Sequence, residues 1–187
     1  MKRTKLMAAS LAFIAFISPA VAEGSDSLSL LDGIKRDFAE RRSDVALTLR
    51  KSEGTWKATE MRVILRANEP VVGPKTDLRD LEAVSVSSTE EVSAAQVKSV
   101  AGLPRLRRLV LDAGLTEAVL SEVSAVDGLQ DVDLCDLGHN RFQSPGLQKL
   151  ARLKNLRKMR LALAGFEQPV LNGLKMLRRV DRLDLDL

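Results

Sequence analysis

The 187-residue sequence predicts an α/β protein in which a parallel sheet is built from stacked strand–loop–helix units. Three observations support this fold class. The pattern L-x-x-L-x-L returns five times, an apolar helical stripe stands between successive copies, and the copies begin 23 to 27 residues apart. A period of roughly 20–29 residues is typical of repeats that each contribute one strand. A single unit cannot cover its own apolar face, so stacking is expected to bury a continuous core.

The first element along the chain is a predicted secretory signal peptide at residues 1–22. Three basic residues precede a twelve-residue apolar run at residues 6–17, and a small-residue cleavage site ends at Ala22. The run is shorter than the roughly 20 residues that span a bilayer. We expect cleavage after Ala22, no membrane span in the mature chain, and a secreted or periplasmic location. An uncleaved membrane anchor is the alternative.

Removing the signal peptide leaves 165 residues, the size of one domain, and changes the charge balance. The segment contains three of the 29 basic residues and none of the 25 acidic ones, so the remainder is nearly neutral. Nucleic-acid binding through overall charge is therefore not expected. The chain has a single cysteine, which excludes an intramolecular disulfide.

Residues 23–77 are expected to cap the first apolar end of the repeat array. A helix is predicted over residues 26–42, where four apolar side chains fall on one face. The alternating runs DVALTLRK and TWKATEMRVILRAN follow, joined by a Gly-containing turn, and predict a β-hairpin. Val63 and Leu65 in the second run also fit the core positions of a degenerate repeat strand.

Residues 78–187 contain the five copies of the strand pattern. The core positions are Leu81/Val84/Val86, Leu106/Leu109/Leu111, Leu129/Val132/Leu134, Leu156/Met159/Leu161 and Val180/Leu183/Leu185. In the intervening segment SPGLQKLARLKNL, leucines recur every three residues, as one side of a helix requires. Pro145 and Pro169 stand just before two such segments, where proline opens a helix without losing a hydrogen bond. Each unit should therefore run strand, loop, helix.

The stretch FQSPGLQKLARLKNLRKMRL resembles the bacterial leucine-rich repeats that carry an I-T-D-x-G-L-x-x-L-x-x-L-x-x-L segment, and the likeness covers about residues 78–187. The resemblance implies a curved solenoid with a parallel sheet on the concave side, helices on the convex side and a leucine core. The sequence departs from the family where many repeats place an inward Asn or Cys. Those positions hold Thr89, Gly114, Leu137 and Ala164.

Side chains between the core leucines should point to the concave face, because side chains alternate along a strand. Across neighbouring strands, one predicted row is Ala83, Arg108, Asp131, Lys158 and Arg182, and the next is Ser85, Val110, Asp133, Arg160 and Asp184. The charges largely alternate in sign, which fits either a self-neutralising ladder or a recognition surface. The candidate binding residues are Arg108, Asp131, Asp133, Lys158, Arg160, Arg182 and Asp184.

Candidate catalytic and metal-binding groups are few. Cys135 and His139 could form a nucleophile–base pair, but no orienting group is evident, so an inert sheet thiol and a loop histidine are favoured. Asp131, Asp133 and Asp136 resemble a Ca²⁺ cluster, but basic residues expected on the same face would repel the ion. We expect no catalytic residue, no cofactor and no metal.

These observations favour a non-enzymatic protein–protein interaction module that binds through the concave face outside the cytoplasm. The sequence stops at Leu187, directly after a predicted strand. The alternative is a structural protein that forms a homo-oligomer through this uncapped carboxyl-terminal edge. An enzyme built on Cys135 and His139 is a remote third possibility.

Overall fold

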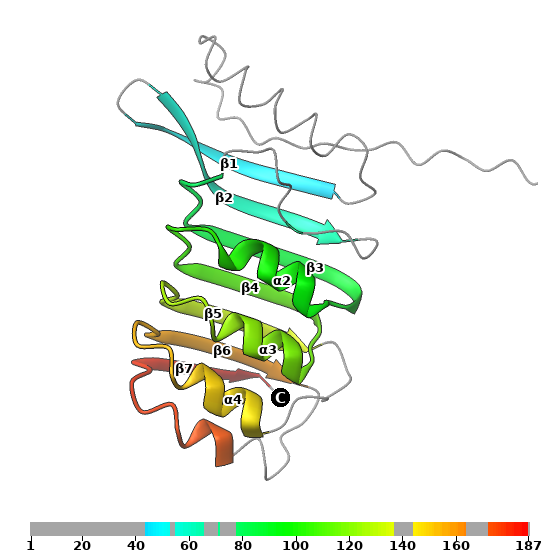
Figure 1. The fold of residues 1–187 in the computed structure, drawn as a ribbon, viewed down its shortest axis with the longest axis vertical. Coiled ribbons are helices and arrows are strands. Elements are labelled where there is room, and N and C mark those ends of the chain that lie inside the picture. Colours follow the sequence, from blue (N-terminus) through cyan, green and yellow to red (C-terminus); the bar gives the residue numbers. More distant parts are fainter. Residues whose placement is uncertain are drawn as a thin grey trace, which may run out of the picture.

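The computed structural model describes residues 44–52, 55–65, 71, 78–136, 144–163 and 172–186. The described strands form one seven-stranded sheet whose order follows the chain, from β1 to β7 (Figure 1). The first pair is antiparallel, and every later neighbouring pair is parallel. The α/β class and the largely parallel sheet predicted from the sequence are confirmed.

The strands are β1 (Asp44–Ser52), β2 (Thr55–Leu65), β3 (Ala83–Glu91), β4 (Arg108–Gly114), β5 (Asp131–Asp136), β6 (Lys158–Leu163) and β7 (Arg182–Asp186). The helices are α2 (Ala94–Ala101), α3 (Glu117–Val123) and α4 (Ser144–Leu150). These helices lie side by side along one face of the sheet (Figure 1). None of the helices in the described ranges is long and apolar enough to cross a membrane. The predicted signal peptide and the predicted helix at residues 26–42 lie outside those ranges.

The antiparallel pair β1–β2 is the hairpin predicted from the two alternating runs. Its second strand then pairs in parallel with β3, with Val63 opposite Val86. Val63 and Leu65 are buried, as the core positions of β3 to β6 are. The second strand of the hairpin therefore doubles as the first parallel strand, as its apolar pattern predicted.

The core lies between the sheet and the helices. The repeat-pattern core residues of β3 to β6 are at most 1% exposed: Val84, Val86, Leu109, Leu111, Val132, Leu134, Met159 and Leu161. Val97, Leu120 and Leu147 belong to the same core on the helix side. A buried Leu or Val contributes roughly 1.5–3 kcal/mol of transfer free energy, whereas ordering the backbone costs about 1–2 kcal/mol per residue. Each unit therefore needs several such side chains.

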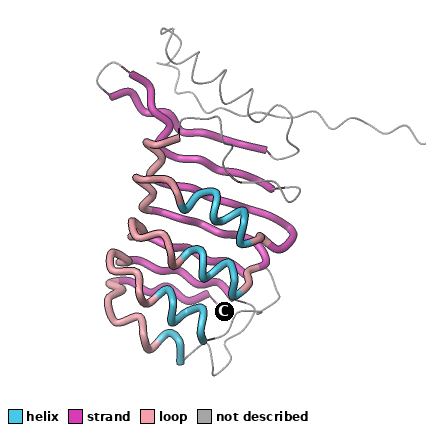
Figure 2. The backbone as a smooth tube through the Cα atoms, viewed as in Figure 1, coloured by secondary structure: helices cyan, strands magenta, loops and turns pink. Residues whose placement is uncertain are grey.

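A repeated backbone hydrogen bond aligns the turns that precede the strands. The N–H groups of Glu82, Arg107, Gln130, Arg157 and Asp181 each donate to the carbonyl of the equivalent residue one unit earlier, at 2.7–2.9 Å. The turns at residues 78–82, 103–107, 126–130, 153–157 and 177–181 therefore stack in line, and we call this line the turn edge (Figure 2). The aligned turns and the buried leucines specify the same strand register.

Two helices begin at side-chain caps that the sequence supplies. At α2, the Ser93 hydroxyl accepts from the N–H of Gln96 at 3.3 Å, and the Gln96 side chain accepts from the N–H of Ser93 at 2.7 Å. At α3, the Thr116 hydroxyl accepts from the N–H of Val119 at 3.4 Å. Such caps satisfy backbone donors that a helix cannot satisfy internally.

The core positions of the last strand, β7, are more exposed than the repeat pattern predicts. Leu183 is 37% exposed and Leu185 is 43% exposed, although the pattern predicts both to be core residues. Among the described strands, β7 pairs only with β6, so one side of its apolar residues has no neighbouring strand–helix unit to cover it.

Gly114 is a position at which a side chain has no room. A Cβ atom there would lie 2.9 Å from Cγ and 3.2 Å from Cα of Glu91, because the end of β3 pairs with Gly114 of β4. We expect Gly114→Ala to lower the free energy of unfolding by about 1–3 kcal/mol, measured by urea denaturation.

Gly102→Ala is the matched control for this substitution. Nothing lies within 4 Å of a Cβ atom at Gly102, and its φ of −80° suits any residue. We expect its free energy of unfolding to stay within about 0.5 kcal/mol of the unsubstituted protein. Equal losses in the two variants would contradict the overpacking argument.

Candidate functional site

The candidate site lies on the face of the sheet opposite α2 to α4, which we call the open face. Strand pairing reproduces both predicted rows. Arg108 pairs with Asp131, Asp131 with Lys158 and Lys158 with Arg182 in one row. The other row consists of Ser85, Val110, Asp133, Arg160 and Asp184. The seven predicted binding residues therefore share one face.

A shallow pocket of about 270 Å³ lies over β4 to β7 on this face. Its lining contains all seven predicted residues together with Met159: Arg108, Asp131, Asp133, Lys158, Arg160, Arg182 and Asp184. Four of the seven side chains are cationic and three are anionic. The pocket is therefore polar and close to charge balance, with one excess positive charge.

Two of the cross-strand ion pairs expected from the rows are present. Arg108 Nε lies 3.6 Å from Asp131 Oδ2, and Arg160 Nη1 lies 3.7 Å from Asp133 Oδ2. Exposed pairs of this kind contribute about 0–1 kcal/mol to stability. Their main effect is to orient charged groups on the surface.

Other pairings differ from those the rows suggest. Asp184 lies opposite Arg160 in the sheet, but its carboxylate binds Arg182 Nε at 2.8 Å. Arg160 instead donates from Nε to Asp186 Oδ2 at 2.9 Å. The reason is geometric, because side chains two residues apart on a strand share a face and a long arginine can reach a neighbouring row.

Lys158 is the uncompensated cation of the pocket. No described residue forms an ion pair or a hydrogen bond with its ammonium group, whereas Arg108, Arg160 and Arg182 each contact a carboxylate. Lys158 lies between Asp131 and Arg182 in its row. It is therefore the side chain most available to a negatively charged group from outside.

Burial changes the titration of two groups on this face. It raises the pKa of Asp133 above 3.8, and the attraction of Arg160 and then Arg108 opposes the change. Burial also raises the pKa of Cys135, and a hydrogen bond with Asp112 adds to the effect. The Cys135 side chain is partly exposed. Its raised pKa disfavours the thiolate that a nucleophile requires, and His139 lies outside the described residues.

The three aspartates that resembled a Ca²⁺ cluster do not converge. Asp136 points into the core, is 4% exposed, and accepts a hydrogen bond from the N–H of Leu115 at 3.2 Å. Asp131 and Asp133 lie on the opposite face, beside arginines. Within the ranges that the structure describes, no group of three or more His, Cys, Asp and Glu side chains could hold a metal ion.

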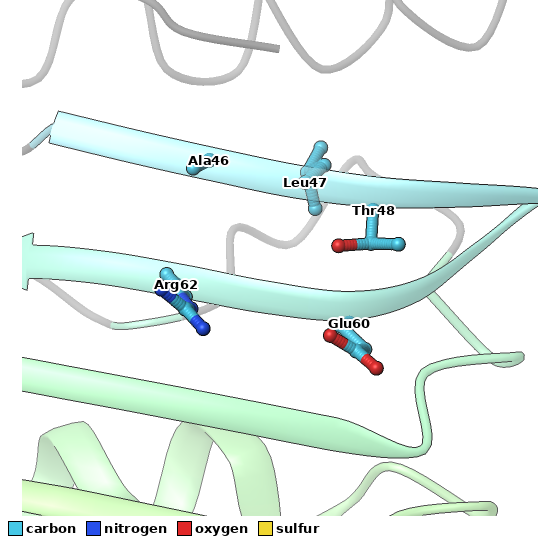
Figure 3. Close-up of a pocket in the computed structure, with 5 residues that line it drawn as sticks. All are labelled: Ala46, Leu47, Thr48, Glu60 and Arg62. Atoms are coloured by element: carbon cyan, nitrogen blue, oxygen red, sulfur yellow. The ribbon is translucent and has the colours of Figure 1, made fainter. Parts of the chain in front are cut away.

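The open face also extends further toward the amino terminus than the sequence predicted. Glu60 pairs with Ala83 and Arg62 pairs with Ser85, so β2 continues both rows. These side chains line a second pocket of about 260 Å³ with Ala46, Leu47 and Thr48 (Figure 3). The small residues Ala83 and Ser85 separate the two charged regions. The hairpin pattern contained the signal, since Glu60 and Arg62 alternate with buried Met61 and Val63.

Comparison with known proteins supplies no family for the chain, because no family model and no curated protein matches its sequence. The chemistry of the site therefore rests on its own residues. Oriented charges of both signs surround one free ammonium group, and they can bind a polar surface.

The raised pKa of Asp133 makes the stability of the protein depend on pH. The folded state retains the Asp133 proton at pH values at which the unfolded chain, with a pKa near 3.8, has released it. The contribution of Asp133 to stability is therefore greatest below pH 3.8 and falls as the pH rises through the folded-state pKa. Urea denaturation should show that the free energy of unfolding of Asp133→Asn, relative to that of the unsubstituted protein, increases as the pH rises from 3.8 through the folded-state pKa of Asp133.

Carboxyl NMR titration checks the cause of this pH dependence directly. Arg160→Gln should raise the pKa of Asp133 further, because the attraction of Arg160 is the largest effect opposing burial. A folded-state pKa at or below 3.8 in the unsubstituted protein would contradict the assignment.

Proposed function

We propose that the protein is a leucine-rich-repeat solenoid of the secreted or periplasmic space that binds another protein through the open face, without catalysing a reaction. The pocket lined by seven charged side chains is the observation that carries this proposal. The stacking of one strand–helix unit per sequence repeat supports the solenoid. The signal-peptide pattern at residues 1–22 supports export.

The composition of the open face favours a protein over a small apolar ligand. Small-molecule pockets are usually lined by apolar and aromatic side chains, whereas this pocket is lined almost entirely by charged ones. Ala83 and Ser85 form an uncharged strip that lets a partner approach the sheet between the two charged ends. Without aromatic anchors among the pocket residues, recognition depends on charge complementarity, which supports fast and specific association more than high affinity.

A carboxylate of the partner is the expected counterpart of Lys158. The three arginines of the pocket already contact carboxylates of this chain, so they present partly neutralised charge. When Lys158 binds a carboxylate of the partner, it gains an ion pair and loses none, because it has no ion pair with a described residue of this chain. The raised pKa of Cys135 further favours binding over nucleophilic catalysis.

A second candidate function is self-association through β7. Its support is the exposure of Leu183 and Leu185 on the outermost described strand. Exposed strand edges can pair with another chain, although Asp184 and Asp186 on the same strand oppose such pairing by charge.

Substitution of Lys158 tests the open-face proposal. The partner would first be captured from the native envelope or medium with a photo-crosslinking residue at Ser85, and then purified. We expect Lys158→Glu to weaken its binding by about tenfold, because the new carboxylate would face a like charge of the partner. Isothermal titration calorimetry measures the change.

Lys98→Glu is the matched control for Lys158→Glu. Lys98 is exposed on α2, on the helix side of the sheet, and the substitution makes the same change in net charge. The partner should bind this variant with unchanged affinity. The same affinity for Lys158→Glu and the unsubstituted protein would remove the open face from the proposal.

Sedimentation equilibrium tests self-association. If β7 pairs with a second copy, the mass should rise with concentration, and Leu185→Lys should shift the equilibrium to the monomer because it places a charge on the contact strand. A strictly monomeric species throughout the concentration range would exclude this second function.

A further inference from the structure

The turn edge carries a concentrated positive charge at its carboxyl-terminal end. Residues 150–157 and 174–181 contain six basic residues and one acidic residue. The equivalent segment one unit earlier, residues 123–130, contains one acidic residue and no basic one. Residues 100–107, two units earlier, contain Arg105 and Arg107 and no acidic residue. The basic charge is therefore densest in the last two turns, with three basic residues in each.

The two basic turns have the same local geometry and are neighbours. The N–H of Leu153 donates to Leu150, and the N–H of Leu177 donates to Leu174, each at 3.0 Å. The N–H of Asp181 donates across the turns to the carbonyl of Arg157 at 2.7 Å. Neighbouring strands lie about 4.8 Å apart, so the cations of both turns form one surface. This surface, the basic patch, consists of Arg152, Lys154, Lys175, Arg178 and Arg179.

The charge of the basic patch is not neutralised within the described structure. All five residues are exposed. Lys175 Nζ lies 3.5 Å from the amide oxygen of Asn172, and none of the five forms an ion pair with a described residue. Elsewhere on the turn edge, by contrast, Arg105 lies 2.8 Å from Asp80. The patch is thus available to an external anion.

An apolar side chain projects from the same surface. Met176 is 54% exposed and stands in the sequence KMLRR, between Lys175 and the two arginines. The adjacent Leu177 is buried and anchors this segment to the core. Cations around an exposed apolar side chain are typical of proteins that lie on anionic membranes, where the cations meet phosphates and the apolar group enters the interface.

We propose that the basic patch docks the protein on an anionic lipid surface. Guanidinium groups match phosphate oxygens in pairs, and each cation near such a surface contributes about 1 kcal/mol. Nucleic acid fits less well, because residues 150–157 and 174–181 contain no aromatic side chain on which a base could stack. The exposed Met176 would also gain little from a phosphate backbone. The proposal concerns the turn edge and is independent of binding at the open face.

Vesicle sedimentation of the full chain tests this proposal. The protein should partition more strongly to vesicles that contain phosphatidylglycerol than to vesicles of phosphatidylcholine alone, and added salt should reduce the difference. The apolar run at residues 6–17 and the three basic residues before it are common to all variants, so any difference between variants reports on the substituted residues. Arg178→Glu with Arg179→Glu should reduce the phosphatidylglycerol-dependent partition by about thirtyfold. Met176→Ser should reduce it less and leave its salt dependence unchanged.

A double variant with the same change in net charge is the control. Arg50→Glu with Lys98→Glu alters two exposed cations that lie outside the basic patch, on β1 and α2. Its partition should equal that of the unsubstituted protein. The proposal is overturned if the two double variants lose partition equally, or if Arg178→Glu with Arg179→Glu loses none. Binding to DNA or heparin without binding to phosphatidylglycerol vesicles would also overturn it.

Discussion

The backbone hydrogen bonds between successive turns hold the strands of neighbouring units in register, and the rest of the structure depends on that alignment. Each inward Leu, Val or Met then meets its counterpart in the next strand, so burial and register reinforce each other. Side chains alternate between the two faces of a strand, so shifting the pairing register by one residue would expose all the apolar side chains of that strand. The same alignment places outward charges in rows.

Much of the fold could be predicted because the signals are local and repeated. Leu109 and Leu111 are separated by one residue and recur as Val132 and Leu134 in the next unit, which fixes both the inward face and the pairing. The open-face rows follow from the same alternation without further information. The role of β2 as the first parallel strand could also be predicted, because Val63 and Leu65 repeat the spacing of a core pair. The one unanticipated extension of the face, at Glu60 and Arg62, belongs to that strand.

The side-chain partners within the site could not be predicted in the same way. Row positions put Asp184 beside Arg160, yet Asp184 binds Arg182 and Arg160 reaches Asp186. Exposed ion pairs differ by less than about 1 kcal/mol, so residue spacing does not select among partners within reach of one flexible arginine. The inward Asp136 is a different case. Because side chains alternate, Asp136 is expected on the buried face with Leu134, where the structure has it. The Ca²⁺ interpretation instead grouped it with Asp131 and Asp133 of the open face.

The order of charges across β4 to β7 has a consequence for how any partner can seat. Along one row the signs run plus, minus, plus, plus, and along the other they run neutral, minus, plus, minus. A ligand displaced sideways by one strand spacing, or turned end for end, would bring several groups against charges of their own kind. A partner of complementary charge is therefore fully matched in one docking position and one orientation, even when no single contact is strong.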